Sequence, residues 1–124
     1  MAPHILIAED DGDLAFLLQE ACKREGHRVE SEATGARALE RLRLGTYDLF
    51  LLDIRLPDGS GLDLLPRCQE LAPEVPIIVM TAYSTRQTAL EAIRRGAYDF
   101  FSKPFQLSEV QTVIRRALER RRLQ

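Results

Sequence analysis

The sequence contains no apolar run that approaches the roughly 20 residues of a membrane-spanning helix. Its opening, MAPHILIAEDD, lacks the basic start and the long apolar stretch of a secretory signal. The chain also has no large excess of one charge. Its formal net charge is -2, so bulk electrostatics do not favour a polyanion as partner. These absences predict a cytoplasmic chain with no membrane anchor and no direct nucleic-acid binding.

Cysteine is also scarce, and both cysteines fall on the apolar stripes of expected helices. Cys22 and Cys68 are therefore interpreted as buried free thiols of a cytosolic protein rather than as a disulfide. The 124 residues contain no linker and no low-complexity stretch. This length suits one domain, and we expect residues 1–124 to form it.

Short apolar runs alternate with segments of helical spacing. The runs are Ile5–Ala8, a weaker one near Val29, Leu49–Leu52, Ile77–Met80 and Tyr98–Phe101. The runs LFLL and IIVM do not alternate with polar residues, as is typical of parallel strands covered on both faces. Repeated strand–helix units predict an α/β fold with a doubly wound, five-stranded parallel sheet.

The expected helices are marked by caps and by glycines. We expect helices to begin after Asp11, near Thr34, at Leu62, near Ser84 or Thr85 and at about residue 107, the last ending near 122. Gly26, Gly45 and Gly96 are the expected stops of the first, second and fourth. Pro66 falls early in the third helix, where a missing N–H costs least, although a kink could follow.

Polar residues follow four of the expected strands directly. Glu9 and Asp10 follow the first strand, Asp53 the third, Thr81 the fourth and Lys103 the fifth. Each alone fits a turn or a solvated surface. Ligands of such sheets bind beyond the carboxyl ends of the strands, so the joint pattern predicts one site at that edge.

Clustered carboxylates repel one another unless a cation compensates them. A site with few protein ligands and open coordination positions suits Mg²⁺. The candidate ligands are Glu9, Asp10 and Asp53, with Glu9 binding either directly or through water. Lys103 and Thr81 would each meet a phosphate oxygen. The set favours phosphoryl transfer with Asp53 as the nucleophile. We expect Asp53 to stand at the rim of the sheet rather than as a buried charge.

Four ordered motifs resemble the response-regulator receiver domain of bacterial two-component signalling. They are ILIAEDDGDLAFLL, DLFLLDIRLPDGSGLDLL, PIIVMTAYS and GAYDFFSKPF. The resemblance covers essentially the whole chain and implies a flavodoxin-like (βα)5 fold with strand order 2-1-3-4-5. It implies that Asp53 accepts a phosphoryl group from a sensor histidine kinase, and that the domain then switches to control an output domain or partner in transcription regulation.

The resemblance also implies roles for single residues. The implied roles are Mg²⁺ ligands Glu9, Asp10, Asp53 and the Arg55 backbone carbonyl; phosphoryl contacts Thr81, the Ala82 backbone N–H and Lys103; switch residues Thr81 and Phe100; and a cis bond before Pro104. Glu9 replaces the commoner aspartate, Phe100 lacks a tyrosine hydroxyl, and Gln106 replaces a better helix cap. The resemblance implies that Arg55 and Tyr83 flank the path of attacking water. Both are bulky and neither is a carboxylate base, which predicts slow self-dephosphorylation; the alternative is that both are simply exposed loop side chains.

The chain ends in VIRRALERRRLQ, with arginines 115, 116, 120, 121 and 122. We favour a solvated helix face, since no aromatic residues are interleaved; a basic patch and a coiled-coil linker are the alternatives. The segment most resembles receivers of nitrogen-regulation-type sigma-54 activators. That resemblance implies a missing C-terminal output domain and a possible homodimer through the last two helices.

Three rival functions are weighed against the receiver. A Mg²⁺-dependent aspartyl-phosphate hydrolase needs a second aspartate two residues after the nucleophile, where Arg55 stands. A calcium loop starting at Asp53 needs glycine at its sixth position, where Asp58 stands. A phosphorylation-independent, receiver-like interaction module remains an alternative, although such modules usually lose pocket residues that are all present here.

Overall fold

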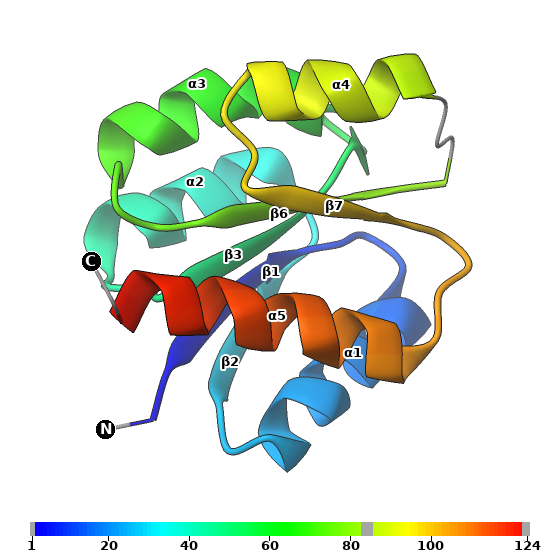
Figure 1. Ribbon diagram of the computed structural model, residues 1–124. Helices are drawn as coiled ribbons and strands as arrows, with labels where there is room; N and C mark the ends of the chain where they lie inside the picture. Colours follow the sequence, from blue (N-terminus) through cyan, green and yellow to red (C-terminus); the bar gives the residue numbers. More distant parts are fainter. Residues whose placement is uncertain (1, 83–85, 123–124) are drawn as a thin grey trace.

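The computed structural model describes residues 2–82 and 86–122. Five parallel strands form a sheet in the order β2-β1-β3-β6-β7 (Figure 1). The strands are β1 (His4–Ala8), β2 (Arg28–Glu32), β3 (Leu49–Asp53), β6 (Ile77–Thr81) and β7 (Asp99–Ser102). Counted along the sheet's own strands, this is the predicted order 2-1-3-4-5. The α/β, doubly wound prediction is confirmed.

The helices follow the strands as the sequence pattern indicates. They are α1 (Gly12–Arg24), α2 (Gly35–Leu44), α3 (Gly61–Leu71), α4 (Arg86–Arg94) and α5 (Leu107–Arg122). Asp11 and Thr34 cap α1 and α2 with their side-chain oxygens, as predicted. The expected caps Ser84 and Thr85 lie outside the described residues. None of the described helices has the length and apolar character that a membrane crossing requires.

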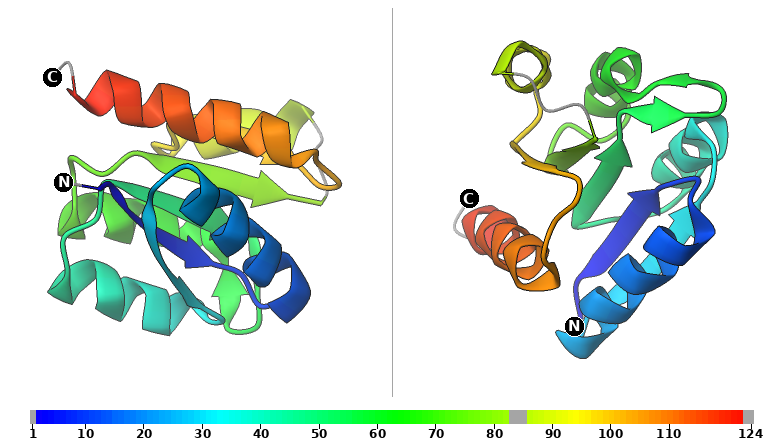
Figure 2. Two further views of the ribbon diagram at one scale, coloured as in Figure 1. Left: turned by 90° about the horizontal axis from the view of Figure 1, so that it is seen from below. Right: turned by 90° about the vertical axis from the view of Figure 1, so that its right-hand side faces the viewer.

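Two apolar layers cover the two faces of the sheet (Figure 2). One layer joins the sheet to α2, α3 and α4, and includes Phe50, Leu65 and Cys68. The other joins it to α1 and α5, and includes Leu18 and Cys22. Both cysteines are buried and free, as predicted, and burial raises the pKa of each thiol to about 12. Each face of β3 is therefore covered by helices.

Two local expectations need correction. Ser60 caps α3 by accepting from the Leu62 N–H, so the helix begins one residue earlier than expected and Pro66 lies in its second turn. The chain continues as a helix through that proline to Leu71. A short antiparallel hairpin, β4 (Arg55–Leu56) and β5 (Gly59–Ser60), was also not anticipated. Strands of two residues carry no readable periodicity.

Candidate functional site

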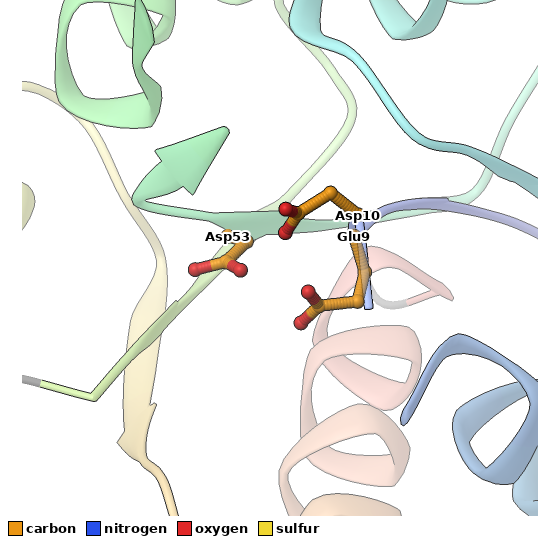
Figure 3. A group of neighbouring side chains, drawn as sticks. All are labelled: Glu9, Asp10 and Asp53. Carbon is orange, nitrogen blue, oxygen red and sulfur yellow. The ribbon is translucent and has the colours of Figure 1, made fainter. Parts of the chain in front are cut away.

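The fold brings together the carboxylates predicted from the strand ends. Glu9, Asp10 and Asp53 each offer an oxygen, and these oxygens all lie within 4.8 Å of one another. Figure 3 shows the three side chains converging from the ends of β1 and β3. Glu9 and Asp53 are buried, 2% and 3% exposed, whereas Asp10 is exposed. Asp53 does end its strand at the edge of the sheet, but the expectation that it would not be buried was wrong.

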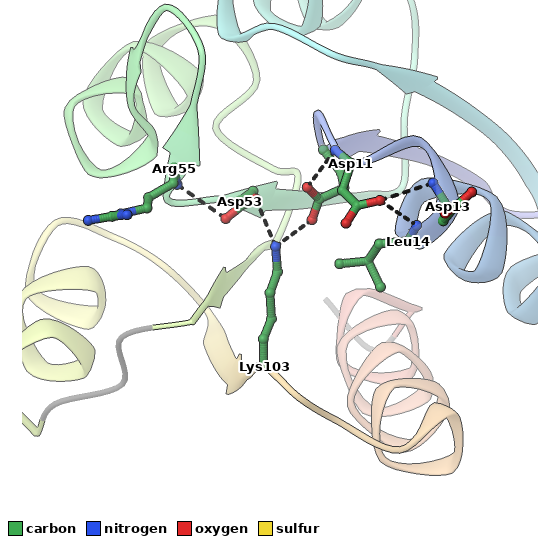
Figure 4. A network of polar contacts seen from close by, with 7 residues as sticks. Asp11, Asp13, Leu14, Asp53, Arg55 and Lys103 are labelled. Atoms are coloured by element: carbon green, nitrogen blue, oxygen red, sulfur yellow. Dashed lines mark hydrogen bonds and ion pairs between the residues drawn. The ribbon is translucent and has the colours of Figure 1, made fainter.

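Lys103 bridges the two buried carboxylates. Its Nζ lies 2.6 Å from Glu9 Oε1 and 2.9 Å from Asp53 Oδ2 (Figure 4). Although burial opposes it, the hydrogen bonds to Asp53 and Glu9 raise the pKa of the Lys103 ammonium. The peptide bond that follows, Lys103–Pro104, is cis, as the resemblance implied. The buried charge of Asp53 is thus tolerated because a cation sits against it.

Glu9 is held in place by the neighbouring strand β2 and by its own loop. Its backbone N–H donates to the Glu32 carbonyl (3.0 Å), and its Oε2 accepts from the Asp11 N–H (3.1 Å). Burial raises the pKa of the Glu9 carboxyl to about 7, while the hydrogen bond from Lys103 opposes the rise. One ammonium therefore does not compensate the whole cluster. An oxygen-rich, under-compensated group of this kind fits a hard divalent cation such as Mg²⁺.

Asp53 itself is fixed by its neighbours on β3 and in the hairpin. The Arg55 backbone N–H donates to Asp53 Oδ1 at 3.1 Å. Next to it in the sheet, β6 ends in Thr81, which is buried with 3% exposure. The Thr81 carbonyl accepts from the Lys103 N–H at 2.8 Å, so the ends of β6 and β7 are tied together. The site is thus built at the ends of four strands, β1, β3, β6 and β7, and on the loops that follow them.

The remaining predicted residues are only partly placed. Ala82 follows Thr81 directly and is exposed, whereas Tyr83 lies outside the described residues. Phe100 is half-buried and packs on the layer formed by α2, α3 and α4. Asp58, in the hairpin turn, was not among the predicted site residues. Its carboxylate in fact contacts the first turn of α2, a contact between distant segments that no local pattern signals.

Comparisons with known proteins agree with this geometry. The sequence family described as "Response regulator receiver domain" matches residues 5–115. The DNA-binding transcriptional regulator NtrC of Azospirillum brasilense is 39% identical over 117 residues, 94% of this chain and 24% of the relative. The response regulator protein PilR of Pseudomonas aeruginosa is 38% identical over 116 residues, 94% of this chain and 26% of the relative.

Solved structures show the same likeness. NtrX from Brucella abortus superposes with a TM-score of 0.92 at 35% identity, covering 99% of this chain and 28% of that one. The beryllofluoride-activated NtrC4 receiver domain dimer superposes with a TM-score of 0.91 at 27% identity, covering 95% of this chain and 97% of that one. The chain spans about a quarter of the length of the curated relatives it matches. The resemblance to receivers of nitrogen-regulation-type regulators is confirmed.

Proposed function

Because this chain belongs to the family of response regulator receiver domains, we propose that it accepts a phosphoryl group on Asp53 from a sensor histidine kinase. The observation that carries this proposal is the placement of Asp53. It is a buried carboxylate at the end of the central strand, bonded to Lys103 and within 4.8 Å of Glu9 and Asp10 oxygens. Among the described residues Glu9 shares this burial, ammonium contact and clustering, but it follows β1, whereas Asp53 ends the central strand of the sheet.

The proposed reaction is a displacement at phosphorus. An Asp53 carboxylate oxygen forms the new P–O bond while the P–N bond to the donor histidine breaks, and that histidine leaves with the bonding electron pair. Lys103, 2.9 Å from Asp53 Oδ2, lies where it can hold an oxygen of the incoming phosphoryl group. The Thr81 hydroxyl and the Ala82 backbone N–H are the further proposed phosphoryl contacts.

The acidic oxygens are proposed to hold Mg²⁺. Glu9, Asp10, Asp53 and the Arg55 carbonyl are the ligands, and the first three already supply oxygens within 4.8 Å. Bound Mg²⁺ would supply neutralisation of the charge on the phosphoryl oxygens. These residues fit this role because the cluster sets three carboxylates against the one ammonium of Lys103.

The test is phosphorylation of the purified chain by acetyl phosphate with Mg²⁺, followed by intact mass. Wild type is expected to gain one phosphoryl group, and Asp53→Asn to gain none. Asp63→Asn is the matched control, because Asp63 is an aspartate on α3 with a 77% exposed side chain. It should be labelled like wild type. Labelling of Asp53→Asn, or no labelling of wild type, would contradict the proposal.

The lifetime of the acyl phosphate is proposed to be long. Arg55 is exposed beside Asp53 and, like Tyr83, offers no carboxylate to activate water at neutral pH. We expect the double variant Arg55→Asn, Tyr83→Glu to lose its phosphoryl group faster than wild type. Decay of the radiolabelled acyl phosphate measures this. A decay in the variant that is equal or slower would remove the proposed role of these positions.

Phosphorylation is proposed to be signalled through the surface that α4, β7 and α5 form. Leu90 and Ile93 are 55% and 44% exposed on α4, an apolar surface available to a second copy of the domain. Thr81 and Phe100 are the proposed switch residues behind this surface. A C-terminal output domain that controls transcription through sigma-54 polymerase is the proposed target. Mass measured with Mg²⁺ and beryllofluoride tests the dimer, with Leu90→Asp as the variant expected to stay monomeric.

A further inference from the structure

The hairpin β4–β5 is joined closely to the phosphoacceptor strand. At its base the Gly61 N–H donates to the Ile54 carbonyl at 2.6 Å. A Cβ on Gly61 would lie 2.3 Å from the Asp53 carbonyl oxygen, so only glycine allows this approach. The two strands pair Arg55 with Ser60 in antiparallel register. The base of the hairpin is therefore in direct contact with the Asp53 segment, and a shift of the hairpin would alter that contact.

The turn of the hairpin is tied to a different element. Asp58 Oδ1 accepts from the Gly35 N–H at 2.8 Å, and its Oδ2 accepts from the Ala36 N–H at 2.9 Å. The right-hand view of Figure 2 shows the hairpin beside α2. The hydrogen bonds from Gly35 and then Ala36 lower the pKa of the Asp58 carboxyl. Asp58 is therefore a charged acceptor held on the first turn of α2.

These two bonds add to the cap of α2. The first four N–H groups of a helix, counted from the N-cap residue, have no partner within the helix. The Thr34 side chain accepts from one of them, the Arg37 N–H. Asp58 accepts from two more, the Gly35 and Ala36 N–H groups. The helix thus has two separate capping residues, one local and one on the hairpin.

Packing supports the same contact. A Cβ on Gly35 would lie 2.6 Å from Leu64 Cδ1 and 3.5 Å from Leu56 Cδ1. Leu56 belongs to the hairpin and is buried. The missing side chain at Gly35 lets the hairpin and α3 come close to the start of α2. The contact of the hairpin with α2 is thus both apolar and charge-assisted.

We propose that Asp58 is a positioning residue for the phosphoacceptor site, because it anchors the hairpin whose first residue is Arg55. The Arg55 N–H donates to Asp53 Oδ1 at 3.1 Å, and the Arg55 carbonyl is a proposed Mg²⁺ ligand. Loss of the anchor lets this backbone move, which weakens both contacts. This inference rests on the proposed function of Asp53. The competing explanation is that Asp58 only stabilises α2.

Thr34→Ala separates the two explanations, since it removes a cap from α2 and leaves the hairpin contact in place. For Asp58→Ala, we expect calorimetry to show a roughly three- to tenfold loss of Mg²⁺ affinity. This is at or below the smallest loss of affinity that is usual when a residue supporting a metal ligand is removed. The Arg55 amide should exchange its hydrogen faster. Asp58→Asn keeps one acceptor and should lie between wild type and Asp58→Ala. Thr34→Ala should change neither quantity.

Equal changes in Asp58→Ala and Thr34→Ala, or no change in Asp58→Ala, would overturn the inference. If Asp58→Ala does not fold, Asp58→Asn compared with Thr34→Ala decides the question by the same two measurements. Neither measurement needs phosphoryl transfer. Failure of acetyl phosphate to label Asp53 would therefore count against the proposed function alone, while the exchange rate of the Arg55 amide still reports on the anchor.

Discussion

Two clusters of charged side chains differ in burial and in the balance of their charges. The carboxyl-end cluster, Glu9, Asp10, Asp53 and Lys103, sets three carboxylates against one ammonium and buries two of the carboxylates. The edge cluster, His4, Glu30, Glu32 and Arg41, lies on edge strand β2 and its neighbours. Its Arg41 and Glu30 side chains are 46% and 30% exposed.

The charged groups of the edge cluster are paired with one another close to water. Arg41 contacts both Glu30 and Glu32, and His4 Nε2 lies 2.6 Å from Glu30 Oε1. Such exposed pairs are inexpensive to make and add little stability. The carboxyl-end cluster instead keeps buried acids that its own ammonium does not compensate. A cation-binding site requires this excess of negative charge, and the domain loses stability through it.

Removal of the single buried cation should have the largest effect. In Lys103→Met, Glu9 and Asp53 remain buried without their ammonium partner. We expect the free energy of unfolding at pH 7 to fall by about 3 kcal/mol, the low end for a broken buried pair because Glu9 can take up a proton. Urea unfolding without Mg²⁺ measures it. A loss as small as that of an exposed pair would mean that the two clusters do not differ as described.

The contribution of Glu9 to stability can be measured from the way the free energy of unfolding changes with pH. The pKa of Glu9 is raised from 4.5 to about 7, so between these values the folded state binds more protons than the unfolded state. Stability in Mg²⁺-free buffer should therefore decrease as the pH rises, by about 2 kcal/mol from pH 5 to 7.5. His27, whose pKa is lowered mainly by burial, acts in the opposite direction.

Glu9→Gln is the control for that slope, because it removes the Glu9 proton and leaves His27 in place. The difference between wild type and Glu9→Gln in thermal unfolding across this pH range should carry the whole Glu9 contribution. Parallel curves for the two proteins would show that burial does not raise the pKa of Glu9 as the structure indicates.

Replacement of Asp10 should change the free energy of unfolding by less than Lys103→Met does, and in the opposite direction. Asp10 adds a third negative charge to the carboxyl-end cluster from an exposed position. Asp10→Asn should therefore stabilise the Mg²⁺-free protein by about 0.5 kcal/mol, as expected for an exposed charge pair, and weaken Mg²⁺ binding. Urea unfolding and calorimetry measure the two changes. Destabilisation without Mg²⁺ would show that repulsion does not dominate at this position.

The edge cluster should give the smallest effect. Arg41→Met removes two exposed ion pairs, with Glu30 and Glu32, but keeps the length of the side chain. We expect the urea midpoint to stay nearly unchanged and to move far less than in Lys103→Met. A shift comparable to that of Lys103→Met would break the distinction drawn between the clusters.

The sequence predicted the sheet well because its strands are buried on both faces. LFLL in β3 and IIVM in β6 are continuous apolar runs, and polar residues follow each run directly. Strand ends of a parallel sheet share one edge, so Glu9, Asp53 and Lys103 could be grouped from position alone. The position of a residue in the sequence does not predict how deeply its side chain is buried. The 3% exposure of Asp53 depends on the hairpin and on β6, which lie outside its own segment.

The features that were not predicted depend on long-range contacts. Asp58 and Gly35 are separated by 23 positions. Neither the PDG turn nor the cap at Thr34 signals that the two segments meet. The start of α3 was misplaced for a local reason, since Ser60 is the cap and Gly61 a poor helix former. Boundaries and tertiary caps therefore remain the parts that the structure had to supply.

Strand β3 is hydrogen-bonded to β1 on one side and to β6 on the other, and all five of its residues are buried. The proposed acceptor thus lies on a strand with little room to shift. Asp53 is therefore a fixed point, and a chemical change there can displace only the parts of the domain that the sheet holds less tightly. The signal would then consist of a movement of the loops relative to a strand that does not move.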